Sequence, residues 1–236
     1  MYNPVGNIFF TIEAERPFGQ MEEDMKNILC FGDSNTWGYT PGTAVRYDLN
    51  TRWTGILQNE LGADYRVLED GLNARTSVYE DPWSPWRLGK EALPIALVAQ
   101  KPLDLLVLMI GTNDLKFVDA YSAAKGAETL INLAQAVQDR KESSPVFPNG
   151  LKVLLVSPIL LDPCVANDPF GTLRNGAEES RKFAYYYRHV AESKGVYFLD
   201  AAAVAQPSKI DGVHMEPESH LALGKAIAAE VRRILE

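Results

Sequence analysis

Histidine and cysteine are scarce in this chain, whose 236 residues include three histidines and two cysteines. Cys30 and Cys164 alone cannot make the disulfide framework of a small secreted protein. The scattered histidines, without a Cys-x-x-Cys pair, leave no metal-ligand set of the usual kind, so we expect no metal site. A glycine-rich phosphate loop is also missing, and we therefore expect no cofactor.

Long apolar runs and clusters of positive charge are lacking as well. No apolar run approaches the roughly 20 residues that a membrane-spanning helix needs. The formal net charge is −8, and an acidic chain without a basic cluster is a poor partner for nucleic acid or an anionic membrane. We therefore expect a small-molecule partner and neither nucleic acid nor membrane.

The first residues lack the features of a signal peptide. They have no basic start, and the apolar run at residues 8–10 is too short. Residues 1–24 show no helical or strand periodicity, so we expect them to be an N-terminal extension or the result of a misplaced start codon. Residues 25–236 are expected to form a single domain, and the expected location is the cytoplasm.

The chain does contain a regular alternation of strand-like and helix-like segments. Hydrophobic residues make up 46% of the sequence and charged residues 23%, as in globular proteins. The strand-like runs are almost continuously apolar, which predicts a parallel sheet covered by helices on both faces. The expected strands are residues 27–31, 65–69, 104–110, 151–157 and 196–199, and helical stripes lie within residues 53–61, 130–137, 181–194 and 217–234.

Two short motifs near the ends of this pattern carry nucleophile chemistry. The first strand-like run ends at Gly32-Asp33-Ser34, and the chain later reads Asp211-Gly212-Val213-His214. A serine hydroxyl becomes a nucleophile only when a base takes its proton and a carboxylate holds that base. Each motif is weak alone, because turn serines that cap helices and exposed loop histidines are common.

Two further segments lie between these ends, at residues 71–76 and 111–114, and each follows a strand-like run. Together the four segments resemble the four sequence blocks of the SGNH (GDSL-type) hydrolases, from about Met25 to the end of the chain. The Cys-Phe-Gly-Asp-Ser start at Cys30 and the Arg-Trp-Thr-Gly stretch at Arg52 are most similar to the arylesterase/acyltransferase branch. The resemblance implies the SGNH hydrolase fold, a three-layer α/β/α flavodoxin-like doubly wound sheet of five parallel strands in the order 2-1-3-4-5.

The resemblance also implies the roles of the site residues. Ser34 would be the nucleophile, His214 the base and Asp211 the acid. The oxyanion hole would be formed by the backbone N–H groups of Ser34 and Ala74 and by the Asn113 amide. Asn113 could instead be a turn asparagine. The rival carboxylates are Asp33, which is expected to brace the serine turn, Asp114 and Asp200.

Several positions depart from the family pattern or stand beside it. Many members have glycine where Ala74 stands, and the backbone donor survives this change if the site does not need a positive φ angle. Asn35 replaces the leucine of the GDSL name, and we expect this to cost little. Trp37 and Asn73 are expected in the substrate pocket. His220 and His189 are expected at the surface.

The loop at residues 79–88 contains Trp83 and Trp86, each directly preceded by a proline. Exposed aromatic clusters mark pocket walls or interfaces, and members of the resembling branch form homo-oligomers. We therefore expect a homo-oligomer with this loop at a subunit contact.

The sequence thus predicts a serine esterase that hydrolyses short-chain aryl or alkyl esters through an acyl-enzyme, with acyl transfer to alcohols as a further activity. One alternative is a carbohydrate or lipid deacylase of the same fold, because the fold does not fix the leaving group. The other is a catalytically silent flavodoxin-like binding module.

Overall fold

A computed structural model describes residues 25–140, 144–167 and 172–236 of the chain. The predicted extension, residues 1–24, lies outside the described residues. The strands form one parallel sheet in the order β2-β1-β3-β4-β5, which confirms the predicted topology. The strands are β1 (Lys26–Gly32), β2 (Tyr65–Gly71), β3 (Leu105–Met109), β4 (Val153–Ser157) and β5 (Tyr197–Asp200).

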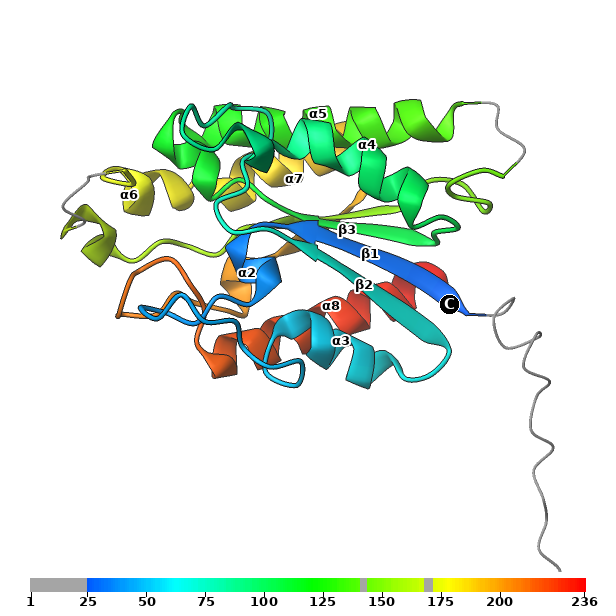
Figure 1. Cartoon of the computed structure of the whole chain (residues 1–236), viewed down its shortest axis with the longest axis horizontal. Helices are drawn as coiled ribbons and strands as arrows, with labels where there is room; N and C mark the ends of the chain where they lie inside the picture. The colour runs from blue at the N-terminus through cyan, green and yellow to red at the C-terminus, as the bar shows by residue number, and fades with distance from the viewer. Residues whose placement is uncertain (1–24, 141–143, 168–171) are drawn as a thin grey trace, which may run out of the picture.

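Helices cover both faces of the sheet, as Figure 1 shows. Helices α3 (Trp53–Leu61) and α8 (Pro217–Leu235) pack together on one face. Helices α4 (Gly89–Ala99), α5 (Ala120–Gln138) and α7 (Phe183–Lys194) cover the other. Shorter elements lie in the connections: α2 (Ser34–Trp37), η1 (Pro85–Arg87), η2 (Asn113–Lys116), η3 (Pro163–Asn167), α6 (Gly176–Ser180) and η4 (Ala201–Ala203).

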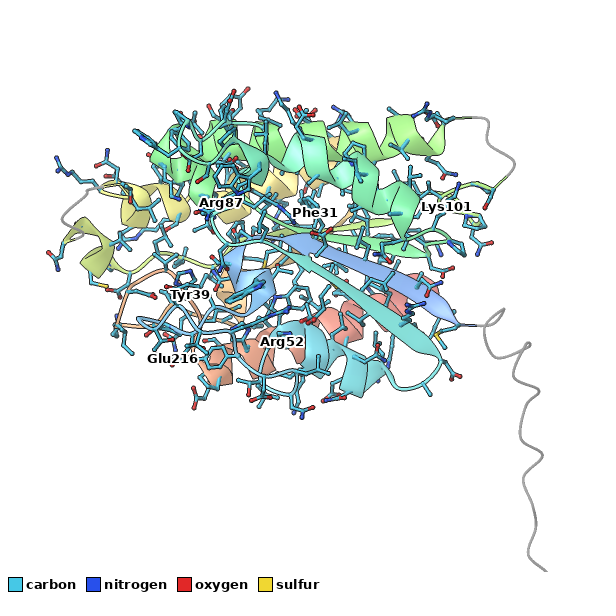
Figure 2. All side chains as sticks on the ribbon, in the orientation of Figure 1. Phe31, Tyr39, Arg52, Arg87, Lys101 and Glu216 are labelled. Atoms are coloured by element: carbon cyan, nitrogen blue, oxygen red, sulfur yellow. The ribbon has the colours of Figure 1, made fainter. Side chains whose placement is uncertain are left out.

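A charged network fastens the long connection between α2 and α3. The guanidinium of Arg52 donates to both carboxylate oxygens of Glu69, over 2.6 and 2.7 Å, and to the Tyr47 carbonyl over 3.0 Å. Figure 2 shows Arg52 on the α3 side of the sheet. Bidentate arginine–carboxylate pairs fix orientation as well as distance. The loop that follows α2 is therefore anchored to β2.

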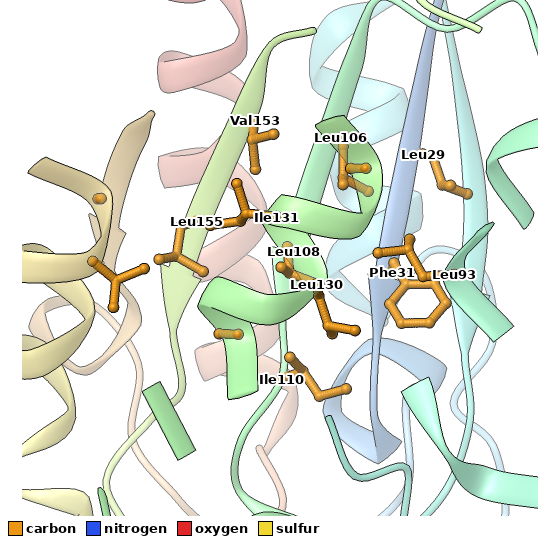
Figure 3. Packing of buried hydrophobic residues seen from close by; sticks show 14 of the residues in the cluster. Leu29, Phe31, Leu93, Leu106, Leu108, Ile110, Leu130, Ile131, Val153 and Leu155 are labelled. Atoms are coloured by element: carbon orange, nitrogen blue, oxygen red, sulfur yellow. The ribbon is translucent and has the colours of Figure 1, made fainter. Parts of the chain in front are cut away.

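Alternate residues of each strand enter opposite halves of the core. Leu29 and Phe31 of β1 pack toward α4, α5 and α7, where Figure 3 shows them beside Leu93 and Leu108. Their neighbours on β1, among them Ile28, join the second core, which faces α3 and α8. This period of two explains why the strands read as continuous apolar runs in the sequence.

Two features of the helices differ from the sequence prediction. Helix α4 is not among the predicted helices and carries Pro94 in its interior. His220 of α8 was expected at the surface, but this prediction is wrong because its side chain is fully buried. Its Nδ1 atom accepts a hydrogen bond from the Trp53 backbone N–H over 3.3 Å, so it caps the start of α3.

The carboxyl ends of β1, β2 and β3 lead directly into α2, into residues 72–76 and into residues 110–113. In open parallel sheets this edge is where ligands bind. Among the helices that the structure describes, none is long and apolar enough to span a membrane.

Candidate active site

The turn that carries Ser34 is shaped by its two preceding residues. Gly32 ends β1, and a Cβ atom there would lie 2.5 Å from the Met109 carbonyl oxygen, so only glycine fits. Asp33 caps α2, because its carboxylate accepts from the Asn35 N–H over 3.0 Å. Its expected role as a brace of the turn agrees with this contact. Burial raises the pKa of Asp33 to about 6, although the Asn35 hydrogen bond opposes the shift.

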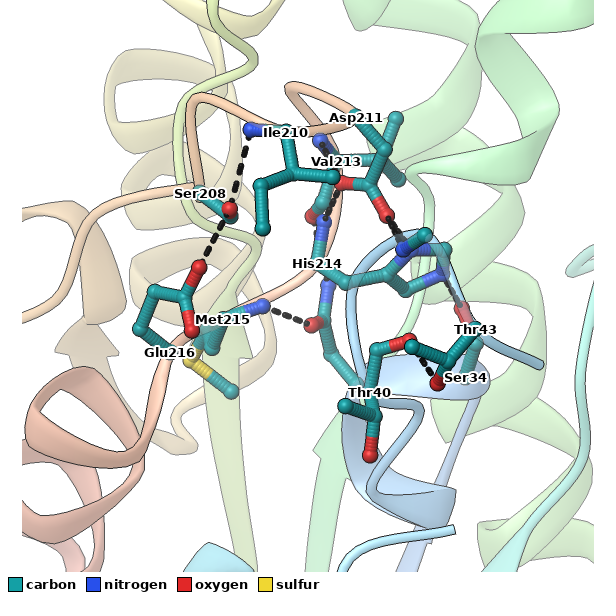
Figure 4. Close-up of polar contacts among 12 residues, drawn as sticks. Ser34, Thr40, Thr43, Ser208, Ile210, Asp211, Val213, His214, Met215 and Glu216 are labelled. Atoms are coloured by element: carbon teal, nitrogen blue, oxygen red, sulfur yellow. Dashed lines mark hydrogen bonds and ion pairs between the residues drawn. The ribbon is translucent and has the colours of Figure 1, made fainter. Parts of the chain in front are cut away.

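Ser34, His214 and Asp211 form one hydrogen-bonded chain, drawn in Figure 4. The Nε2 atom of His214 lies 2.9 Å from the Ser34 Oγ atom, and its Nδ1 atom lies 2.8 Å from the Asp211 carboxylate. Ser34 and His214 are 180 residues apart in the chain, and they meet at the carboxyl edge of the sheet. The arrangement can pass a proton from the serine hydroxyl to an oriented imidazole.

Asp211 is held in its ionised form by its neighbours. Burial alone would raise its pKa, but hydrogen bonds from the His214 ring and from the backbone of Val213 and His214 lower it to about 2. The two backbone N–H groups donate to Oδ1 over 3.0 Å each, and Gly42 donates to Oδ2 over 3.2 Å. A fixed carboxylate of this kind stabilises a protonated imidazole at His214.

The loop that bears His214 is organised by Ser208. The backbone N–H of Ser208 donates to the His214 carbonyl over 2.7 Å, and its carbonyl accepts from Gly212 over 2.9 Å. Its hydroxyl donates to Glu216 over 2.5 Å and accepts from the Ile210 N–H over 3.0 Å, as seen in Figure 4. The hydrogen bonds of Ser208 therefore fix the loop that positions Asp211 and His214. The spacing of residues in the sequence did not reveal this role of Ser208.

The rival carboxylates have other partners. Asp114 is fully buried and accepts from the Ser77 N–H over 2.8 Å, and burial raises its pKa to about 7. Asp200 accepts from the Ser157 hydroxyl over 2.9 Å and caps η4. Among the described residues, Asp211 alone forms an ion pair with His214.

Unsatisfied donors lie beside Ser34. The buried Nδ2 atom of Asn113 has no hydrogen-bond partner among the described residues, although Asn113 lines the same cavity as Ser34. The Ser34 N–H opens α2, where the first N–H groups have no acceptor within the helix. The bond between Asp114 and Ser77 ties the Asn113 segment to residues 72–77, and so brings Ala74 to the same cavity.

Ala74 stands in the left-handed region, with a φ of 61°. The backbone donor was expected to survive the change from glycine to alanine if the site needs no positive φ, and this condition is not met. Alanine can adopt this conformation, but at a cost of roughly 1–2 kcal/mol. The Arg75 guanidinium holds the segment by donating to the Gly32 and Asp70 carbonyls over 3.0 and 2.6 Å.

A cavity of about 700 Å³ opens over the Ser34 hydroxyl. Asn73 lines it as expected, and its Oδ1 atom is buried without a partner among the described residues. Trp37, also expected there, is absent from the lining, and its ring lies against the Arg46 guanidinium instead. Tyr39, and not Trp37, lines the cavity, and its ring stacks on the His214 ring with 4.1 Å between the ring centroids. The lining comprises Ser34, Tyr39, Asn73, Ala74, Asn113, Lys116, Cys164, Val165, Asn167, Thr172, Leu173, Lys209, Ile210, Asp211, Val213 and His214.

The other predicted features were also located in the structure. Trp83 and Trp86 are exposed by 81% and 69% and do not line the cavity. Cys30 is a buried free thiol and Cys164 a half-buried one. Within residues 25–140, 144–167 and 172–236, no group of three or more histidine, cysteine, aspartate or glutamate side chains could hold a metal ion.

Comparison with known proteins agrees with this geometry. Residues 30–222 match the GDSL-like Lipase/Acylhydrolase family. No curated protein matches the chain significantly. The structure of an aryl esterase from M. smegmatis is 36% identical, with a TM-score of 0.82, and the match covers 89% of this chain and 100% of that one.

Two further structures extend the comparison. A carbohydrate acetylesterase from Sinorhizobium meliloti is 33% identical, with a TM-score of 0.80 over 89% of this chain and 100% of that one. A lipase/acylhydrolase from Enterococcus faecalis is 18% identical with a TM-score of 0.64, over 90% of this chain and 98% of that one, and this likeness concerns the fold alone.

Proposed function

Because the chain belongs to the GDSL-like lipase/acylhydrolase family and is a carboxylic ester hydrolase, we propose that Ser34 is its nucleophile, His214 its base and Asp211 its acid. The observation that carries this proposal is the continuous hydrogen-bonded chain from the Ser34 hydroxyl through His214 to Asp211. The silent binding module is dropped, since the family and the similar esterases establish ester hydrolysis.

The reaction follows from this geometry in two halves. The Ser34 Oγ atom attacks the ester carbonyl while His214 Nε2 takes the hydroxyl proton. Collapse of the tetrahedral intermediate transfers that proton to the departing alcohol and leaves an acyl-enzyme. Water then repeats the attack with His214 again as base, and the acid is released. Asp211 holds the imidazole in the required orientation throughout.

The negative charge of each intermediate needs donors that already point at the carbonyl oxygen. The Asn113 Nδ2 atom and the backbone N–H groups of Ser34 and Ala74 suit this role, because they lie at one cavity, and the Asn113 amide is buried without a partner among the described residues. Replacement of Asn113 by alanine should lower kcat by on the order of 10²- to 10³-fold and change KM far less. An unchanged kcat would mean that Asn113 is only a turn residue.

A cavity of about 700 Å³ is in the range of sites for small ligands, which supports short aryl or alkyl esters as substrates. A carbohydrate acetyl ester is the second candidate. It is favoured by the polar part of the lining, including Asn73, Asn167 and Thr172, and by the likeness to a carbohydrate acetylesterase. Initial rates on nitrophenyl esters from acetate to octanoate, against rates on acetylated sugars, distinguish the two.

Further parts of the proposal go beyond hydrolysis. Acyl transfer to alcohols would need an acceptor to compete with water at the acyl-enzyme.

A homo-oligomer is supported by the exposed Trp83 and Trp86, which a partner subunit would cover. We also propose a cytoplasmic location.

A further inference from the structure

Lys116 lies on the same side of η2 as Asn113. The element is a 3₁₀-helix from Asn113 to Lys116, and residues three apart eclipse each other in such a helix. Both residues line the cavity that contains Ser34 and His214. The lysine therefore stands next to the region where the carbonyl group of a bound ester would lie.

The charge of Lys116 is not neutralised by a contact. Among the described residues, no ion pair or hydrogen bond to its ammonium group is found, and the aspartates that influence it, Asp81 foremost, act from longer range. By contrast, Lys209 on the rim of the cavity is paired with Asp162, and Asp211 is paired with His214. Among the described residues, Lys116 thus contributes to the cavity a charge that is not paired in a direct contact.

The surroundings make that charge effective. Lys116 is half-buried, and burial lowers its pKa below the ordinary lysine value. A partly desolvated cation gains more from a nearby anion than an exposed one. The chain as a whole carries a net charge of −8, so its overall field would repel an anionic ligand. An unpaired cation inside the site counteracts this repulsion locally.

We propose that Lys116 selects esters that carry a carboxylate or another anionic group a few atoms from the scissile carbonyl. This inference rests on the proposed function, since it names the substrate class of the same site. The anionic group could belong to the acyl part or to the alcohol part of the ester. In either position it would accept a charge-assisted hydrogen bond from the Lys116 ammonium group.

Matched pairs of esters test the proposal. For the acyl part, the pair is mono(4-nitrophenyl) glutarate and 4-nitrophenyl hexanoate, and for the alcohol part it is 3-acetoxybenzoate and 3-tolyl acetate. We expect Lys116→Met to lower kcat/KM for the anionic member of one pair by about 10- to 100-fold, mainly through KM. The neutral member should lose far less, and Lys116→Arg should restore most of the preference.

Two controls make the result decisive. Lys90→Met removes the same charge from an exposed position outside the cavity and should leave the ratio within each pair unchanged. Equal losses on anionic and neutral esters in Lys116→Met would mean a general role at the oxyanion and would overturn the proposal. An unchanged ratio in both pairs would overturn it as well.

A binding measurement separates this inference from the proposed function. Calorimetry with glutarate on the Ser34→Ala protein should detect binding that is lost in Ser34→Ala/Lys116→Met. If the wild type hydrolyses none of the esters, the proposed function fails, but glutarate binding that depends on Lys116 would still support the anion site. Binding that is equal in the two variants refutes it.

Discussion

The Oδ1 atom of Asn35 accepts a hydrogen bond from the backbone N–H of Met215 over 3.2 Å. The Nδ2 atom of the same side chain donates to the Val213 carbonyl over 3.1 Å. The Asn35 side-chain amide therefore forms hydrogen bonds to the backbone on both sides of His214. Asn35 also directly follows Ser34 in the chain. Asn35 is almost fully buried, so it links the two halves of the site without touching the cavity.

Replacement of Asn35 by leucine should reduce both stability and turnover. The Met215 N–H and the Val213 carbonyl would lose their buried partners, which costs about 2 kcal/mol in unfolding free energy. The loosened His214 should lower kcat by about 10-fold with little change in KM. Urea unfolding and steady-state kinetics measure the two effects. The same change at the exposed Asn132 should alter neither, and equal behaviour of the two variants would contradict the role of Asn35.

From the sequence alone, asparagine at position 35 is expected to have little consequence. That expectation rests on comparing side-chain types with the family pattern, whereas the contacts of Asn35 are made with residues 178 and 180 positions away. The same limit explains His220, whose burial depends on α3 packing against α8. Local pattern carries no information on such partners.

Features that depend on the local sequence pattern were predicted well. The strands were located to within two residues at each end, because both faces of the sheet are covered and each strand is an apolar run. The start of α8 at Pro217 was also predicted, since proline suits the first turn of a helix. Helix α4 was missed because Pro94 interrupts its pattern.

Replacement of Ala74 by glycine should stabilise the protein. The φ of 61° strains alanine but suits glycine, so the unfolding free energy should rise by about 1 kcal/mol. Loss of the methyl group also enlarges the cavity, and longer acyl chains should be hydrolysed faster relative to acetate.

Ala44→Gly is the matched control for this change. Ala44 has a φ of 59° but does not line the cavity. It should raise stability in a urea titration without changing the acyl-length profile. A destabilised Ala74→Gly protein would show that the strain at Ala74 is not relieved by glycine.

Acidification should destabilise the protein through His220. Burial lowers its pKa from the ordinary 6.5 to about 3, so the unfolded chain binds a proton at pH values where the folded one does not. The stabilising contribution is complete above pH 6.5 and is lost as the pH falls toward 3. Between pH 7.5 and 5 the loss amounts to about 2 kcal/mol.

The buried Asp33 and Asp114 act in the opposite direction. Their raised pKa values mean that the folded protein takes up their protons first, which stabilises it as the pH falls. The effect of His220 is therefore measured as the difference in unfolding free energy between wild type and His220→Asn at pH 7.5 and pH 5. This difference should shrink at the lower pH. A difference that stays constant between the two pH values would contradict the prediction.

Removal of the exposed indoles should dissociate the proposed homo-oligomer. Light scattering on the Trp83→Ala/Trp86→Ala protein should give a lower mass than on the wild type, because two large apolar side chains leave the contact. Tyr185→Ala, which removes an exposed ring from the α7 surface, should leave the mass unchanged. A monomeric wild type at micromolar concentration would rule out the oligomer.

Covalent trapping at Ser34 tests the central claim most directly. Diethyl 4-nitrophenyl phosphate should release about one equivalent of nitrophenolate per active chain and leave a diethylphosphoryl group on the nucleophile. Peptide mass spectrometry is expected to find this group on Ser34 of the wild type, and the folded Ser34→Ala protein should neither react nor hydrolyse esters. A label on another residue, or wild-type ester hydrolysis by Ser34→Ala, would contradict the account.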